Sequence, residues 1–194
     1  PRDILVDGDK VGAIEKPGAI PSSAVGETID AKGRWIVPGL VDLHVHLREP
    51  GFEWKETILT GAKAAALGGY TTICCMPNTS PVNDNAEITR FIVEKAKACP
   101  TRVLPIGAVS KSLKGEQMAP LSELRKAGCA AFSDDGEPIW SAGMMRRALE
   151  WASMLDAPIC CHEEDKSLSC GGSMNESPLS YRMGLKGWAK VAEE

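Results

Sequence analysis

The sequence has 194 residues, of which 43% are hydrophobic and 25% are charged, close to the average for a folded globular protein. This composition excludes a disordered tail, a collagen-like repeat and a low-complexity linker. The 22 Lys and Arg residues against 26 Asp and Glu residues give a net charge of −4, so we expect no nucleic-acid partner. No apolar stretch approaches the roughly 20 residues of a membrane-spanning helix, so we expect no membrane association.

Residues 1–36 predict a small β segment. Residues 4–14, ILVDGDKVGAI, indicate two short strands around an Asp-Gly turn, and residues 28–37 indicate a further strand. The Pro and Gly residues between them predict a loop. This segment is too short to bury a core of its own.

From residue 37 onward, the pattern predicts alternating strands and helices. Strands are expected at 37–47, 70–76, 101–109, 129–134 and 158–164, and helices at 54–67, 85–98, 120–127 and 142–155. Asp84 is the predicted N-cap of the second helix. Strands that are apolar on both faces are typical of a parallel sheet covered by helices. Two architectures fit: an open doubly wound sheet, or the first part of a (β/α)8 barrel, which typically needs about 250 residues.

The seven cysteines predict free thiols rather than disulfides. Their number is odd, and two pairs, Cys74-Cys75 and Cys160-Cys161, are adjacent within apolar runs. Neighbouring residues on a strand point to opposite faces, so these pairs cannot easily bridge. No CxxC spacing indicates a zinc knuckle or a redox motif. We therefore expect reduced, mostly buried thiols that pack in the core of a cytoplasmic protein.

Polar side chains follow the ends of the predicted strands. They are His44 and His46, Asn78, Asp134 and Asp135, and His162 with Glu163 and Glu164. His44 and His46 are two residues apart, so on a strand both side chains face the same way. In α/β barrels the catalytic groups collect at the carboxyl ends of the strands, and this distribution matches that rule.

Two imidazoles at a spacing of two, a third imidazole and a carboxylate are suitable zinc ligands. Zinc takes nitrogen and oxygen ligands at about 2.0–2.2 Å, and a catalytic site keeps one position for water, whose pKa falls to about 7. Each element also has an ordinary interpretation: Asp-Asp-Gly is common in turns, and a single His after an apolar strand is most often a hydrogen-bonded core residue. Their joint occurrence at three strand ends favours the metal site.

DLHVHLREPG at residues 42–51 resembles the dihydroorotases of the amidohydrolase superfamily. The similarity continues through WKETILTGAKAAALGGYTT, MPNTSPVND, FSDDG, CHEED and GGSMNESPLS, and so covers nearly the whole sequence. HLREPG together with MPNT separates this family from hydantoinases and allantoinases. The resemblance implies a (β/α)8 TIM-type metal-dependent hydrolase barrel. Residues 37–194 would form its first five or so βα units, and residues 1–36 the N-terminal part of a small β-sandwich domain.

The resemblance implies a reversible reaction of pyrimidine biosynthesis, in which N-carbamoyl-L-aspartate cyclises to L-dihydroorotate by a zinc-hydroxide mechanism. One or two zinc ions would lie in each active site. His44 and His46 match ligands of the more buried zinc, Asp135 matches the bridging ligand, and His162 matches a ligand of the second zinc.

Arg48 and Asn78 match residues that hold the α-carboxylate of the substrate. Arginine suits this role because its planar guanidinium meets a carboxylate in two parallel hydrogen bonds. The ordinary alternative for Arg48 is a surface ion pair with Glu49 or Glu53.

Two departures from the wider superfamily matter. Many amidohydrolases bridge their metals with a carboxylated lysine, but no lysine lies between Lys126 and Lys166, so the resemblance is to the branch with a bridging Asp. Strand alternation leaves Asp134 and Asp135 both open, and the resemblance selects Asp135. The family also supplies a His ligand from the sixth strand and a catalytic Asp from the eighth, which we expect beyond Glu194. No catalytic acid or base is therefore expected in this segment, which alone would be inactive.

Two other functions stay open. One is a related cyclic amidase, such as a hydantoinase or an allantoinase. The other is an inactive dihydroorotase-like subunit that scaffolds aspartate carbamoyltransferase, which the intact ligand set speaks against. The resemblance also implies a small-molecule substrate and a homo-oligomer, with aspartate carbamoyltransferase as a candidate partner.

Overall fold

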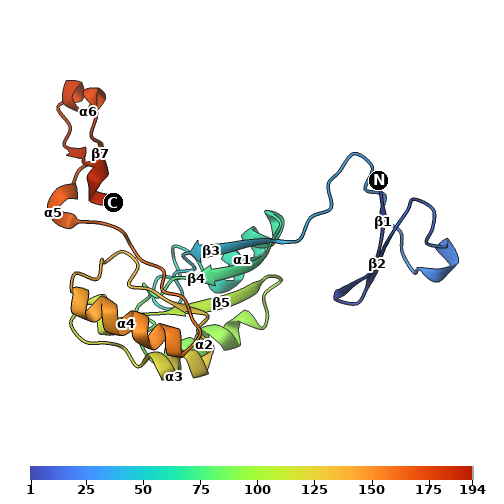
Figure 1. Ribbon diagram of the computed structural model, residues 1–194, viewed down its shortest axis with the longest axis horizontal. Helices are drawn as coiled ribbons and strands as arrows, with labels where there is room; N and C mark the ends of the chain where they lie inside the picture. The colour runs from blue at the N-terminus through green and yellow to red at the C-terminus, as the bar shows by residue number, and fades with distance from the viewer. Residues whose placement is uncertain (194) are drawn as a thin grey trace. The chain divides into compact units, whose positions relative to one another are not determined.

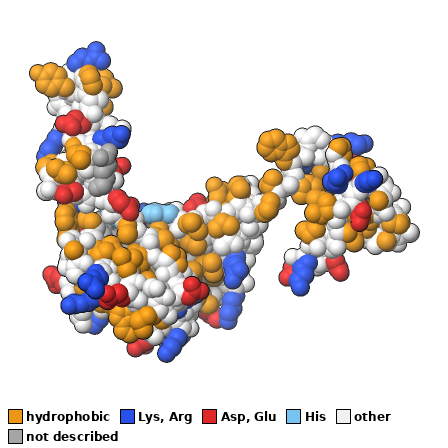
Figure 2. Space-filling view, viewed as in Figure 1, with side chains coloured by type: hydrophobic (Ala, Val, Ile, Leu, Met, Phe, Trp, Pro, Cys, Tyr) orange, Lys and Arg blue, Asp and Glu red, His pale blue; other side chains and the backbone are white. Residues whose placement is uncertain are grey.

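The computed structural model describes residues 1–193 and divides the chain into two compact units, one of which ends at Pro38. In this first unit β1 (Asp3–Asp7) and β2 (Lys10–Glu15) pair as an antiparallel hairpin, as expected, and η1 (Ser22–Ala24) follows. The strand predicted at 28–37 was wrong: the segment pairs with neither edge of the hairpin, and a strand needs such a partner for its backbone hydrogen bonds. Apolar side chains of this unit lie on its surface, as Figure 2 shows.

The second unit contains a sheet of four parallel strands (Figure 1). The strands are β3 (Leu40–Val45), β4 (Tyr70–Cys75), β5 (Arg102–Gly107) and β6 (Ala131–Phe132). A helix follows each strand, namely α1 (Ile58–Leu67), α2 (Ala86–Ala96), α3 (Leu121–Ala127) and α4 (Ala142–Met154). The predicted alternation is confirmed, with shorter elements than the sequence indicates.

The order of strands in the sheet selects between the two predicted architectures. The order β3-β4-β5-β6 follows the chain, and each helix packs against the next, α1 on α2, α2 on α3 and α3 on α4. A doubly wound sheet reverses its order at a switch point and carries helices on both faces, whereas a barrel keeps one order and one helical layer. The unit therefore has the α/β architecture of part of a (β/α)8 barrel.

Apolar clusters join the sheet to its helices. Ile92 of α2 packs with Ile73 of β4 and Val103 of β5, while Phe132 of β6 packs with Leu124 of α3. Each such side chain stabilises the fold by about 1.5–3 kcal/mol through removal from water. The sheet is thus held rigidly beneath the loops at its carboxyl edge.

The start of α2 differs from the expectation. Asn85, not Asp84, is the N-cap, and its side chain accepts hydrogen bonds from the backbone N–H groups of Glu87 and Ile88. The carboxylate of Asp84 instead accepts a hydrogen bond from the backbone N–H of Ser112 in the next loop. The side chain expected at the cap is therefore used to join two loops at the carboxyl edge of the sheet.

The strand expected at 158–164 is reduced to one bridge, between Phe132 and Ile159. The backbone N–H of Phe132 donates to Pro158 O at 3.0 Å, and that of Cys160 donates to Phe132 O at 2.8 Å. Because β6 itself has only two residues, it offers no longer ladder to this segment.

The rest of the chain adds short elements. They are η2 (Lys111–Leu113), α5 (Lys166–Ser169), β7 (Met174–Asn175), α6 (Pro178–Met183), β8 (Gly187–Trp188) and η3 (Lys190–Glu193). All seven cysteines carry free thiols. Cys161 and Cys170 are exposed rather than packed, since neither lies in a covered strand. Among the described residues, no helix combines the length and apolarity that a membrane span requires.

Candidate metal centre

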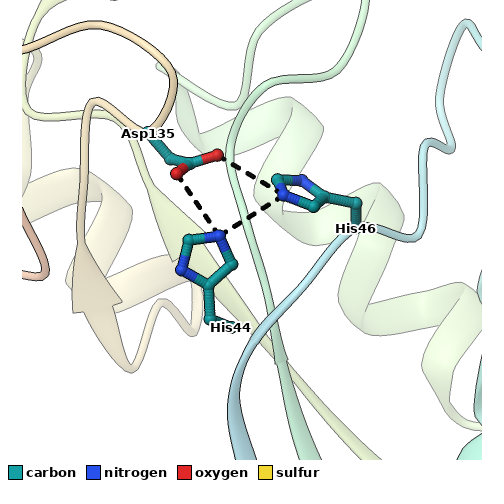
Figure 3. Close-up of side chains that lie close together, drawn as sticks. All are labelled: His44, His46 and Asp135. Carbon is teal, nitrogen blue, oxygen red and sulfur yellow. Dashed lines mark hydrogen bonds and ion pairs between the residues drawn. The ribbon is translucent and has the colours of Figure 1, made fainter. Parts of the chain in front are cut away.

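Three of the predicted ligands meet at the carboxyl edge of the sheet. His44 lies in β3, His46 follows the end of that strand, and Asp135 follows β6 (Figure 3). The Nε2 atoms of the two histidines are 3.3 Å apart. Asp135 Oδ1 lies 3.3 Å from His44 Nε2, and Asp135 Oδ2 lies 3.6 Å from His46 Nε2. The two imidazole nitrogens and the carboxylate of Asp135 therefore face one another closely enough to hold one ion.

These separations fit a divalent metal. Donor atoms placed tetrahedrally at about 2.1 Å from an ion are separated from one another by about 3.4 Å. The ligand atoms of His44, His46 and Asp135 all lie within 4.8 Å of one another, and the closest contacts bracket that value. Imidazole nitrogen and carboxylate oxygen are also the ligands that zinc and similar ions accept.

The electrostatic environment favours neutral imidazole at His46. Burial lowers the pKa of His46, and the nearby positive charge of Arg48 lowers it further, while the hydrogen bond with Asn78 opposes both effects. Asp135 is almost completely buried, whereas the side chain of His44 is half exposed. Histidine side chains consequently reach the surface, where Figure 2 shows them in pale blue. A neutral imidazole has the free lone pair that metal binding needs.

Asn78 lies between two of these side chains. It follows β4, and its Oδ1 is 3.0 Å from His46 Nδ1. Its Nδ2 donates a hydrogen bond of 2.9 Å to Asp135 Oδ2. The residue predicted to hold substrate thus also contacts two predicted ligands, which the sequence did not indicate.

His162 also lies close to the carboxylate of Asp135. His162 Nδ1 lies 3.6 Å from Asp135 Oδ1, while His162 Nε2 lies 3.2 Å from Glu164 Oε2. Its ring is not part of the compact group formed by His44, His46 and Asp135. The carboxylate of Asp135 is therefore close to all three histidines of the chain.

Glu164 is a neighbour of the site that sequence reasoning noted without a role. Ser169 Oγ donates a hydrogen bond to its carboxylate at 2.6 Å, and this bond, more than that from His162, lowers the pKa of Glu164. The signal was its spacing of two from His162, which places both side chains on one face of an extended segment.

The two adjacent aspartates have separate tasks. Asp134 is buried and accepts hydrogen bonds from the backbone N–H groups of Val109 and Ser110, at 2.8 and 2.9 Å, and from the Ser110 hydroxyl. Burial raises the pKa of Asp134. Asp134 thus joins the loop after β6 to the loop after β5 through hydrogen bonds. Of the two aspartates, Asp135 is the one that contacts the histidines.

Arg48 lies in a loop with a constrained backbone. Its φ is +62°, a left-handed conformation that is uncommon for a side-chain-bearing residue. The loop packs on the one after β4: Ser80 N–H donates to Pro50 O, and a Cβ at Gly51 would approach Ser80 O to 2.0 Å. The motif HLREPG therefore contacts Ser80, which directly follows MPNT, in addition to the contact between His46 and Asn78.

The carboxylates that were the alternative partners of Arg48 are occupied elsewhere. Glu49 pairs with Lys95 at 3.0 Å and accepts a hydrogen bond from the backbone N–H of Ile58, while Glu53 accepts one from Gly51. Within residues 1–193, no ion pair involves Arg48. The guanidinium is left available at the edge of the site.

Comparison with known proteins identifies the family. A family model described as dihydro-orotase-like matches residues 33–194. Dihydroorotases from Desulforapulum autotrophicum and Syntrophus aciditrophicus are 51% and 50% identical over 99% of this chain, which spans 45% of each relative, a little under half its length. L-hydantoinase from Arthrobacter aurescens is similar in structure, with a TM-score of 0.65 at 26% identity over 88% of this chain and 38% of that one. The chain belongs to the dihydroorotase-like family.

Proposed function

We propose that the protein to which this chain belongs is a dihydroorotase, which interconverts N-carbamoyl-L-aspartate and L-dihydroorotate in pyrimidine biosynthesis. The main support for the proposal is the convergence of His44, His46 and Asp135 at the carboxyl edge of the sheet. The sequence identity of 50–51% with dihydroorotases supports it as well. Barrel enzymes place their chemistry at this edge.

The donor set supports zinc as the metal. His44 and His46 would hold one ion together with one oxygen of Asp135, and His162 Nδ1 would hold a second ion that shares this carboxylate. Bound zinc would polarise the reacting carbonyl and make water acidic enough to react near neutral pH.

The other residues of the site would bind and orient the substrate. Arg48 would grip the α-carboxylate with its guanidinium, which has no ion-pair partner in the described part of the chain. Asn78 has a second amide N–H beyond the one given to Asp135, and this hydrogen would complete the grip. The resemblance assigns the proton-transferring Asp and a further His ligand to other parts of the whole protein.

The test is a substrate comparison with the zinc-loaded full-length protein. We expect turnover of dihydroorotate and of carbamoyl-aspartate, with little activity on hydantoin or allantoin. Preference for hydantoin, which the structural similarity to an L-hydantoinase makes the second candidate, would overturn the proposal. A folded, zinc-loaded protein without activity on any of the four compounds would instead support the scaffold interpretation.

The whole protein is also proposed to be a homo-oligomer that can associate with aspartate carbamoyltransferase. Seven free thiols support a reducing compartment such as the cytoplasm. Light scattering of the full-length protein, alone and with the carbamoyltransferase of the same organism, tests the assembly. A protein that stays monomeric and does not bind the transferase would contradict the proposed assembly.

A further inference from the structure

We propose that Asn78 is a positioning residue of the metal centre: its amide fixes the tautomer of His46 and the orientation of Asp135, so that His46 presents Nε2 to the ion. The inference rests on the proposed metal centre and extends it. It assigns to Asn78 a role separate from contact with substrate.

The orientation of the amide is set by Asp135. An ionised carboxylate only accepts hydrogen bonds, so the amide atom 2.9 Å from Asp135 Oδ2 must be the nitrogen of Asn78. The flipped amide would place two acceptor oxygens against each other at this distance. Because Asp135 is buried, little water is available to relieve that repulsion. The amide therefore has one favourable orientation.

The orientation of the amide in turn sets the tautomer of His46. With Asn78 Nδ2 on Asp135, the amide oxygen faces His46 Nδ1 at 3.0 Å, and an oxygen there requires a hydrogen on Nδ1. A neutral imidazole carries only one ring N–H, so Nε2 keeps its lone pair. This Nε2 is the atom that lies 3.3 Å from His44 Nε2 and 3.6 Å from Asp135 Oδ2. The lone pair points into the candidate metal centre.

This role leaves Asn78 free to contact substrate as well. A primary amide has two N–H donors and two acceptor lone pairs, and the contacts with His46 and Asp135 use one of each. Outer partners of this kind typically contribute about 10–100-fold to metal affinity. Loss of Asn78 should therefore weaken metal binding in the absence of substrate. Loss of a residue that contacts only the substrate would leave metal binding unchanged.

His162 provides an internal reference for the effect. Its Nε2 faces a carboxylate oxygen of Glu164 and not the amide of Asn78, so the hydrogen of neutral His162 belongs on Nε2. The structure thus assigns opposite tautomers to His46 and His162. A substitution at Asn78 should alter only the first.

The experiment uses metal-free full-length protein labelled with ¹⁵N-histidine. Two-bond proton–nitrogen spectra identify the protonated ring nitrogen, and competition with a chelator measures zinc affinity. We expect Nδ1–H at His46 in the wild type, and in Asn78→Leu a mixture of tautomers together with zinc affinity lowered about 10–100-fold. Asn175→Leu, at an exposed position of β7, is the matched control and should change neither quantity.

The outcomes separate this inference from the proposed function. Asn78→Leu that keeps the wild-type tautomer of His46 and the wild-type zinc affinity would overturn the role of Asn78, even in an active dihydroorotase. Wild-type protein that binds no zinc would overturn the metal centre whatever the spectra show. If Asn78→Leu does not fold, Asn78→Ser provides the same two readouts, since serine is too short to reach both partners.

Discussion

The two sides of the candidate metal centre are built differently. His44 and His46 belong to β3 and its end; β3 pairs with β4 on both sides of an irregularity between Asp42 and Val45, and both rings point toward Asp135. His162 lies in a segment joined to the sheet by one bridge, and its ring is held by Glu164. One side of the centre is thus ordered by the sheet, whereas the other depends on single hydrogen bonds.

Asp135 connects the two sides. Its Oδ2 faces His46 and Asn78, and its Oδ1 faces both His44 and His162. A change at Asp135 should therefore disrupt the whole centre, whereas a change at a histidine should affect mainly the ion on its own side.

The largest expected effect is on the strand side. His44→Ala removes one of the three proposed ligands, and loss of a ligand should weaken zinc binding by more than the roughly 10–100-fold expected for an outer partner. We expect zinc affinity to fall more than about 100-fold, with His46→Ala behaving alike. Metal analysis of the full-length protein after dialysis is the measurement. Full zinc content in either variant would show that the histidine pair is not the ligand set.

His162→Ala separates the two sides. Because the ring of His162 lies outside the compact group of three ligands, we expect the variant to lose one ion and to retain the one at His44, His46 and Asp135. Zinc titration that follows the stoichiometry of binding checks this expectation. If His162→Ala loses all bound zinc, the two sides form a single inseparable site.

Asp134 tests whether the loop that carries Asp135 depends on its attachment to the loop after β5. Asp134→Ala leaves the buried N–H groups of Val109 and Ser110 without an acceptor, which should lower the free energy of unfolding by about 3 kcal/mol. Asp134→Asn retains an acceptor oxygen and should recover at least half of that loss. Urea unfolding of the two variants measures the difference, and equal stability of both would refute the attachment.

Arg48 tests the substrate contacts at the edge of the centre. Arg48→Met keeps the length of the side chain but removes a charged hydrogen bond, so the KM for carbamoyl-aspartate should rise about 10–100-fold. Zinc content should stay unchanged, since Arg48 is not among the ligands. Steady-state kinetics with parallel metal analysis provides both values. An unchanged KM would make Arg48 a structural residue of its loop.

The smallest effect compares thiols of the covered sheet with those of the segment after α4. Burial raises the pKa of Cys75 to about 12 and that of Cys129 to about 11, so both should resist alkylation near pH 8. Cys161 and Cys170 are exposed in the segment after α4 and should react before either buried thiol. Mass spectrometry of timed alkylation measures the order. Early labelling of Cys75 would mean that the sheet opens readily.

Sequence patterns predicted features of the sheet better than features of the loops and of the segment at 158–164. Strand alternation placed His44 and His46 on one face, and the apolar strands separated by helices predicted the parallel sheet. Alternation could not choose between Asp134 and Asp135, because that depends on backbone donors of a loop far away in the chain. The strand at 158–164 was expected from its apolar run, but pairing depends on a neighbour, and β6 is too short to pair further.

The contacts of Asn78 were also beyond sequence reasoning. An amide after a strand indicates a polar contact but not its partners, and His46 and Asp135 approach it from two other strands. The predicted N-cap at Asp84 was wrong for a related reason, since Ser112 competes for that carboxylate. Local patterns predict local structure, whereas the polar contacts between loops depend on the assembled sheet.

Anomalous diffraction at the zinc edge, from crystals of the full-length protein, would show whether His44, His46 and Asp135 hold the metal. We expect a peak about 2.0–2.2 Å from the Nε2 atoms of His44 and His46 and from a carboxylate oxygen of Asp135. A well-ordered, zinc-supplied crystal with no peak at these three side chains, or with its zinc bound elsewhere, would contradict this assignment of the ligands.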